Sequence, residues 1–249
     1  MRALYVAGGE GVRLRLDGPS LVVDRPGRAR QRFPLERLSY VVLCGTVEAD
    51  YRVLRACLAS RIPVAAFDAT GAACGFFLPW QAEAPRPSVL LESFLERSNW
   101  HSHYSDWRRS HERRAIIRAL RAAGLPPLQH EGREAAARAL LALYRDAEAA
   151  RRVLRGWRDL SAPLIHGTLA EKGLCPTLIA GRRPEFDLPS HLASINAWAH
   201  YRALRELGTM PENWAAMIAG YENIRPRDEQ RIRALIDNFL FWLGGARWR

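Results

Sequence analysis

Two apolar stretches separated by a helical pattern decide the fold: Val-Val-Leu-Cys-Gly-Thr-Val at residues 41–47 and Ile-Pro-Val-Ala-Ala-Phe-Asp at residues 62–68. Each is a short apolar run that ends at a glycine or a polar turn, which is typical of a buried strand. Between them, residues 49–60 place apolar side chains broadly at helical spacing. The sequence therefore predicts a strand, a helix and a second strand in this order.

Shorter strands are expected on both sides of this unit. Residues 12–17 alternate valine and leucine with charged side chains, and residues 20–23 are again apolar after a Gly-Pro turn. With the apolar residues 4–6, this pattern predicts a meander of short antiparallel strands, with a hairpin turn at Gly8-Gly9-Glu10-Gly11. Residues 74–78 are expected to form one more strand of a hairpin.

The pattern changes beyond Pro79. Prolines at 79, 85 and 87 indicate a linker, which we assign to residues 81–88, and Ser88 is a candidate cap for the helix that follows. Helical patterns then cover residues 90–95, 107–123, a segment from about 132, 192–207, 213–221 and 227–243. The fold class expected is α+β: a small N-terminal β domain over residues 1–80, made of a strand meander plus one helix, and a larger all-α domain over residues 89–249.

The charge of the chain indicates an anionic partner. Its 249 residues include 37 Lys and Arg against 26 Asp and Glu, a formal net charge of +11, and Lys172 is the only lysine. Guanidinium groups pair with phosphate through two parallel hydrogen bonds, so nucleic acid is the partner expected. A GC-rich genome would explain the preference for arginine over lysine, but not the excess of basic over acidic residues.

The arginines of the helical half are candidate DNA contacts. Trp107 and Trp157 stand among them and could stack on unpaired bases, although tryptophan at helical spacing is more often part of a core. The candidates are Arg108, Arg109, Arg113, Arg114, Arg151, Arg152, Arg155, Arg158, Arg182 and Arg183.

The four cysteines form no Cys-x-x-Cys pair, which disfavours a structural zinc site and favours reduced thiols. The first residues lack the apolar run of a secretory signal, and no stretch approaches the roughly 20 apolar residues of a membrane span. A cytoplasmic protein without a membrane segment is expected.

The ordered N-terminal elements resemble the β domain of the CRISPR-associated adaptation integrase and endonuclease family (Cas one). The resemblance rests on residues 41–47, on Leu54 within the helix, on residues 62–68, on Gly71, and on the exit Gly75-Phe76-Phe77-Leu78-Pro79. It implies a homodimer formed through the β domain, a small ferredoxin-like adaptation subunit as partner, and double-stranded or branched DNA as substrate. It also implies metal-dependent DNA cleavage and integration in antiviral defence, with Mg²⁺ or Mn²⁺ as cofactor.

The family keeps its metal-binding Glu, His and Asp in the helical half. The nearest matches are Glu134, or Glu131 in another register, together with Asp187 and His191. These are the candidate catalytic and metal-binding residues.

The helical half also departs from the family pattern. Cys175 replaces an aspartate in the turn at residues 173–178, the histidine position falls at Arg182, and the helix-like motif at residues 196–201 follows this turn instead of preceding it. Two hypotheses remain open: a compact variant with a rebuilt site, or a degenerate, non-catalytic architectural relative that still binds nucleic acid. An unrelated arginine-rich binding module is the third alternative.

Overall fold

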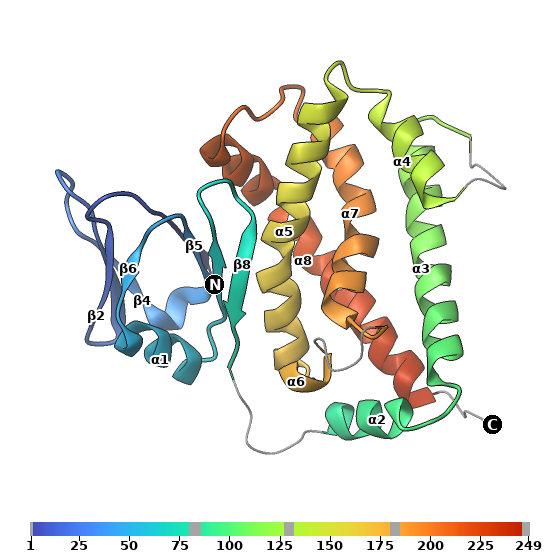
Figure 1. The fold of residues 1–249 in the computed structure, drawn as a ribbon, viewed down its shortest axis with the longest axis horizontal. Coiled ribbons are helices and arrows are strands. Elements are labelled where there is room, and N and C mark those ends of the chain that lie inside the picture. The colour runs from blue at the N-terminus through green and yellow to red at the C-terminus, as the bar shows by residue number, and fades with distance from the viewer. Residues whose placement is uncertain (1, 80–85, 127–131, 180–184, 246–249) are drawn as a thin grey trace. The chain divides into compact units, whose positions relative to one another are not determined.

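The computed structural model describes residues 2–79, 86–126, 132–179 and 185–245. The chain divides into two compact units. The first contains Met1–Pro85 together with Pro163–Pro176, and the second contains Arg86–Ala162 and Thr177–Arg249. Strands precede a mostly helical region along the chain (Figure 1), which confirms the predicted α+β class.

The first sheet is built on the two stretches that suggested the fold. Its spatial order is β1 (Arg2–Ala7), β5 (Leu38–Cys44), β7 (Val64–Phe67), β8 (Ala73–Phe77). The first three strands run parallel and β8 is antiparallel to β7. The connection from β5 to β7 includes the predicted helix, α1 (Tyr51–Ala59), whose first turn is capped by Asp50 accepting from the Val53 N–H at 3.1 Å.

The second sheet holds the antiparallel meander. Its order is β4 (Gln31–Pro34), β3 (Ser20–Asp24), β2 (Arg13–Asp17), β6 (Glu48–Ala49), and a 3₁₀ helix, η1 (Leu35–Arg37), follows β4. The expected hairpin at residues 8–11 is wrong, because β1 and β2 belong to different sheets. The backbone N–H groups of Gly8 and Gly9 instead donate hydrogen bonds to the carbonyls of Cys44 and Thr46, at 2.6 and 3.0 Å, before the chain passes to the second sheet. A Cβ atom at Gly8 would overlap the Thr46 carbonyl, which explains why a glycine stands there.

The core of the first unit lies among these strands and α1. Val6, Val41, Val53 and Cys57 are almost fully buried in one cluster. The last part of α5 also packs in this unit: the His166 ring lies 4.8 Å from that of Phe76.

Seven helices follow residue 85 among the described residues, and several of them are longer than the sequence predicted. They are α2 (Arg86–Leu95), α3 (Trp100–Ala122), α4 (Arg133–Leu141), α5 (Ala147–Glu171), α6 (Pro176–Ile179), α7 (Leu188–Glu206) and α8 (Trp214–Gly245). The helix α5 was not predicted, and the two helices expected at 213–221 and 227–243 are one, with Pro226 inside. Ser88 does not cap α2 but is its third residue and is buried; Pro87 occupies the second position, where a missing N–H breaks no helical hydrogen bond.

Both tryptophans of the arginine-rich segments are core residues. Trp157 is fully buried and donates from Nε1 to the Met217 carbonyl at 3.0 Å, and Trp107 is also buried. Gly156 lets α5 approach α8, because a Cβ there would overlap the Met217 sulfur. Among the described residues, no helix combines the length and the hydropathy needed to cross a bilayer.

Candidate functional site

The start of α4 presents Arg133, not Glu134, to its neighbours. Glu134 lies in the first turn and is exposed to solvent, where a carboxylate interacts favourably with the helix dipole. The adjacent Arg133 reaches the half-buried Glu112 of α3, with 3.3 Å between Nη1 and Oε1. Glu131, the alternative register, lies outside the described residues.

Asp187 has a structural role at the start of α7. It is the N-cap, and its Oδ1 accepts a hydrogen bond from the Ser190 N–H at 3.1 Å. This is the usual way in which an aspartate satisfies one of the free N–H groups of a first helical turn.

His191, one turn into α7, is held at both ring nitrogens. The Tyr104 hydroxyl lies 2.8 Å from Nδ1, and the Arg108 guanidinium donates toward Nε2 at 3.0 Å. Arginine has no acceptor, so Nε2 must accept and the proton of the neutral ring stands on Nδ1, facing the tyrosine oxygen. Burial, together with the charge of Arg108, lowers the pKa of His191. The imidazole is therefore a neutral, fixed hydrogen-bonding group.

The structure thus brings together one candidate metal ligand and one candidate DNA contact, His191 and Arg108, and not the three proposed ligands. The lone pair that a metal ion would take on Nε2 faces a permanent cation. Within the part of the chain that the structure describes, no three His, Cys, Asp or Glu side chains are placed to hold a metal ion. Glu134, Asp187 and His191 as they stand do not fit a divalent ion.

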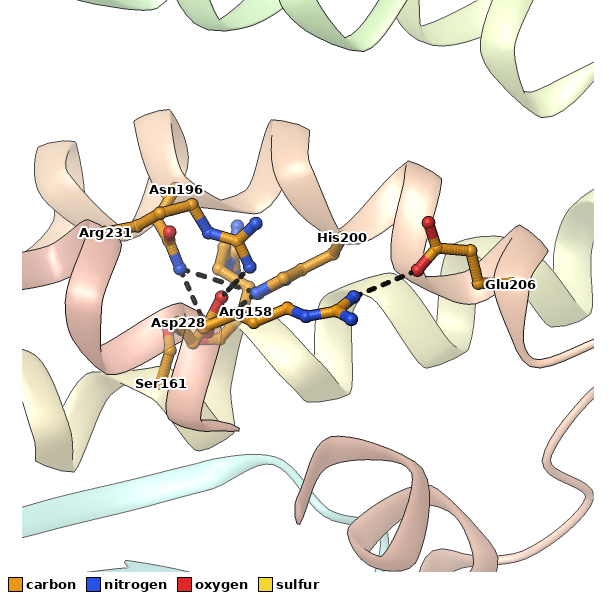
Figure 2. A network of polar contacts seen from close by, with 8 residues as sticks. Arg158, Ser161, Asn196, His200, Glu206, Asp228 and Arg231 are labelled. Carbon is orange, nitrogen blue, oxygen red and sulfur yellow. Dashed lines mark hydrogen bonds and ion pairs between the residues drawn. The ribbon is translucent and has the colours of Figure 1, made fainter. Parts of the chain in front are cut away.

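A second polar centre, which the sequence did not predict, lies buried between α7 and α8 (Figure 2). Asn196, His200 and Asp228 point toward one another, and Arg231 approaches from one turn further along α8. Asp228 accepts on Oδ2 from Asn196 Nδ2 at 3.0 Å and from His200 Nε2 at 2.9 Å, and on Oδ1 from Arg231 at 3.0 Å. The side chains of His200 and Asp228 are both fully buried.

The electrostatics of this centre favour an ionised Asp228. Burial acts to raise the pKa of this carboxyl, but the interactions with His200 and Arg231 outweigh it, so the pKa lies below its usual value. The sequence held one signal for the centre: Asn196 and His200 are four residues apart, a spacing that places both on one face, and the other buried residues of that helix are apolar. Nothing local marked Asp228, whose role depends on the packing of α7 against α8.

The candidate arginines lie in different surroundings. Arg113, Arg114, Arg152 and Arg155 are exposed, whereas Arg109 and Arg151 pair with Asp106 and Glu148 on their own helices. Arg158 pairs with its neighbour Asp159 at 3.0 Å. Arg182 and Arg183 lie outside the described residues.

Comparison with known proteins explains this architecture. Residues 4–91 match the family model described as CRISPR associated protein Cas1. A CAS1 protein from Thermotoga maritima is similar in structure, with a TM-score of 0.82 and 13% identity over 99% of this chain and 98% of that one. The chain is Cas1-like.

Two further structures share the fold of this Cas1-like chain. A casposase bound to an integration product has a TM-score of 0.67 and 10% identity, over 100% of this chain and 92% of that one. TtCas1 in complex with DNA has a TM-score of 0.65 and 14% identity, over 96% and 91%. No curated protein matches. The family resemblance inferred from the first eighty residues is confirmed, while the chemistry of the helical half depends on its own residues.

Proposed function

We propose that this Cas1-like chain is a non-catalytic, DNA-binding subunit of a CRISPR adaptation complex. The observation that carries the proposal is the environment of His191, whose Nε2 accepts from Arg108 while Nδ1 faces Tyr104. A metal ion could bind His191 at Nε2 only by displacing the Arg108 guanidinium, and it would then lie close to that positive charge. Asp187 caps α7 and Glu134 is exposed on α4, and among the described residues neither joins this histidine in a group of three ligands that could hold a metal ion.

The role in DNA binding is supported by exposed arginines in the helical unit. Arg152 and Arg155 lie on the surface of α5, and neither has a carboxylate within ion-pair distance among the described residues. Uncompensated guanidinium groups are suited to phosphate oxygens. Two proteins that share the fold were solved with DNA or with an integration product. We infer double-stranded or branched DNA as the ligand of this chain.

The assembly proposed is a homodimer through residues 1–80, joined by a small ferredoxin-like adaptation subunit, in the cytoplasm. Size-exclusion chromatography with light scattering tests the dimer directly. A monomeric mass at micromolar concentration would count against it.

A cleavage and strand-transfer assay with Mn²⁺ on branched or nicked DNA tests the absence of catalysis. We expect binding without cleavage or joining, and no difference between the wild type and Glu134→Gln. Glu148→Gln is the matched control, because Glu148 is an exposed glutamate in the first turn of α5. Robust cleavage that Glu134→Gln abolishes and Glu148→Gln leaves intact would overturn the proposal and support a rebuilt active site.

A salt titration of DNA affinity tests the arginine surface. The triple variant Arg151→Ala, Arg152→Ala, Arg155→Ala should weaken duplex binding and reduce the slope of log K against log salt by about 0.9 for each phosphate that is no longer neutralised. The matched control removes three arginines of the second sheet, each with a carboxylate partner: Arg13, Arg15 and Arg32. An equal decrease of affinity in both triple variants would indicate a net-charge effect and contradict a defined DNA-binding surface on α5.

A further inference from the structure

The helix α5 belongs to both compact units of the chain. Its residues up to Ala162 are part of the second unit, and those from Pro163 onward are part of the first. The other two places at which the chain passes between the units lie at the starts of α2 and α6. Without a specific cause of a kink, an α-helix bends only gently along its length. The stiffness of α5 therefore decides whether the two units can move independently.

Each half of α5 is held by contacts within its own unit. In the first half, Trp157 is fully buried and donates from Nε1 to the Met217 carbonyl of the second unit at 3.0 Å. In the second half, the His166 ring lies 4.8 Å from that of Phe76 in the first unit. Neither half can turn within its unit without losing these contacts, so any bending must take place between them.

The junction between the halves carries two features that weaken a helix. Pro163 has no N–H, so the carbonyl of Asp159, four residues earlier, loses its helical donor, and the proline ring pushes that carbonyl outward. The buried Ser161 donates from Oγ to the Arg158 carbonyl at 2.6 Å. A serine that bonds back to the preceding turn competes with the backbone donors and often bends a helix. We refer to residues 158–163 as the α5 hinge.

We propose that α5 bends at the α5 hinge, so that the two units change their orientation relative to one another while each half of the helix stays packed in its own unit. A proline inside a helix is not enough for this conclusion, because Pro226 also lies inside one, with residues of the second unit on both sides. Pro163 differs in two respects. It stands where α5 passes from one unit to the other, and Ser161 weakens the same turn.

The hinge has a consequence for the proposed assembly. The dimer is proposed to form through residues 1–80, and the proposed DNA contacts Arg152 and Arg155 lie on the first half of α5. Bending at the α5 hinge lets the two copies of these arginines reach phosphates at more than one spacing. Only this consequence rests on the proposed function, because the hinge itself is tested on the protein without DNA.

Double electron–electron resonance between two spin labels measures the hinge. One label is placed on the exposed Cys74 of the first unit, and the other on Glu148→Cys, an exposed position in the first turn of α5. Cys175→Ser removes the other thiol that is not buried. A reference pair within the second unit combines Glu148→Cys with Gln230→Cys, an exposed position of α8, in a chain that also carries Cys74→Ser and Cys175→Ser. We expect a broader distance distribution for the pair that spans the hinge than for the reference pair.

Pro163→Ala should narrow the distribution of the spanning pair to the width of the reference pair, because alanine supplies the N–H that bonds the Asp159 carbonyl. Pro226→Ala is the matched control, since it also supplies a helical N–H, but within one unit, and it should leave the distribution broad. Hydrogen exchange is a second readout. In Pro163→Ala, exchange of the amides at residues 159–167 should slow by about 2- to 12-fold, the range for one added hydrogen bond, and in Pro226→Ala it should not change there. Circular dichroism verifies that both variants are folded.

Three results would overturn the hinge. The first is a spanning pair whose distribution is as narrow as that of the reference pair, a measurement that needs no substitution within the hinge. The second is an unchanged distribution in Pro163→Ala. The third is equal narrowing by Pro163→Ala and Pro226→Ala, which would indicate a general tightening of the protein and not a hinge in α5.

Discussion

The buried centre between α7 and α8 offers the sharpest test of how this helical unit is held together. The perturbation is Asp228→Asn, which keeps the shape of the side chain and removes its charge. In the native protein both carboxylate oxygens accept hydrogen bonds, from Asn196 and His200 on Oδ2 and from Arg231 on Oδ1. An amide would place its NH₂ group against a donor, and the partners would lose the anion that they surround.

The expected cost is large because the Asp228 carboxylate itself is fully buried. The Asp228 and His200 side chains are fully buried at a separation of 2.9 Å. Removing a buried anion from the partners that it hydrogen-bonds costs about 3–5 kcal/mol. For a chain of this size about 2–4 °C of melting temperature corresponds to each kcal/mol, so the melting temperature should fall by roughly 6–20 °C. The control is Glu206→Gln, which removes exposed pairings with Arg202 and Arg227, each worth at most about 1 kcal/mol.

Acid provides an independent readout of the same centre. The folded-state pKa of Asp228 is lowered, so its contribution to stability is present above the pKa of the unfolded chain, about 3.9, and is lost as the pH falls through the lower folded value. Thermal unfolding measured from pH 7 to pH 3 should therefore show a smaller loss for Asp228→Asn than for wild type below about pH 4. A melting temperature within about 2 °C of wild type at neutral pH, or parallel acid profiles, would refute this reasoning, since that limit corresponds to about 1 kcal/mol or less.

Three further predictions concern other parts of the chain. Gly156→Ala should destabilise by about 1–3 kcal/mol, because the added methyl group overlaps a side chain of α8, whereas Gly244→Ala in open space should be neutral or stabilising by up to about 1 kcal/mol; chemical denaturation compares them. A thiol reagent should modify the exposed Cys74 in the native protein but Cys57 only after unfolding, because burial raises the pKa of Cys57 to about 11. The His191 ring should titrate below 6.5 by NMR, since burial and the adjacent guanidinium lower its pKa; a midpoint above 6.5 would contradict the assigned hydrogen bonds.

The fold of the first unit was largely predictable because its decisive signals are local. An apolar run ending at Gly45, a capped helix and a second apolar run specify a parallel crossover regardless of what else packs there. The hairpin at residues 8–11 was predicted wrongly for the opposite reason. Glycines permit a tight turn, but here they permit β1 to continue beside the carbonyls of Cys44 and Thr46, which are distant in sequence.

The boundaries of the helices were harder to predict from the sequence. A proline usually marks the end of a helix and a run of arginines usually marks a surface, and neither rule held throughout this chain. Pro163 and Pro226 lie inside α5 and α8 and did not end these helices. The arginine-rich segment at residues 151–158 suggested a surface, and only its packing shows that Trp157 is the buried side of the same helix. For the candidate site, the sequence identified His191 and Arg108 but not that they meet, since a contact between α3 and α7 is a tertiary property.

The hydrogen bond between His191 and Arg108 bears directly on how the helical half departs from the family pattern. A site that binds a divalent ion must keep cations away from its ligands, because two positive charges compete for one lone pair. In this chain an arginine of α3 faces the histidine, and Arg133 of α4 faces Glu112 in turn. His191 and Glu112 are thus each matched to a guanidinium group from a neighbouring helix, and Asp187 to a backbone N–H. Such contacts hold neighbouring helices together without a metal ion. On this argument Arg108→Met should free Nε2 of His191 and raise its pKa; isothermal titration with Mn²⁺ that shows binding to wild type and variant alike would contradict it.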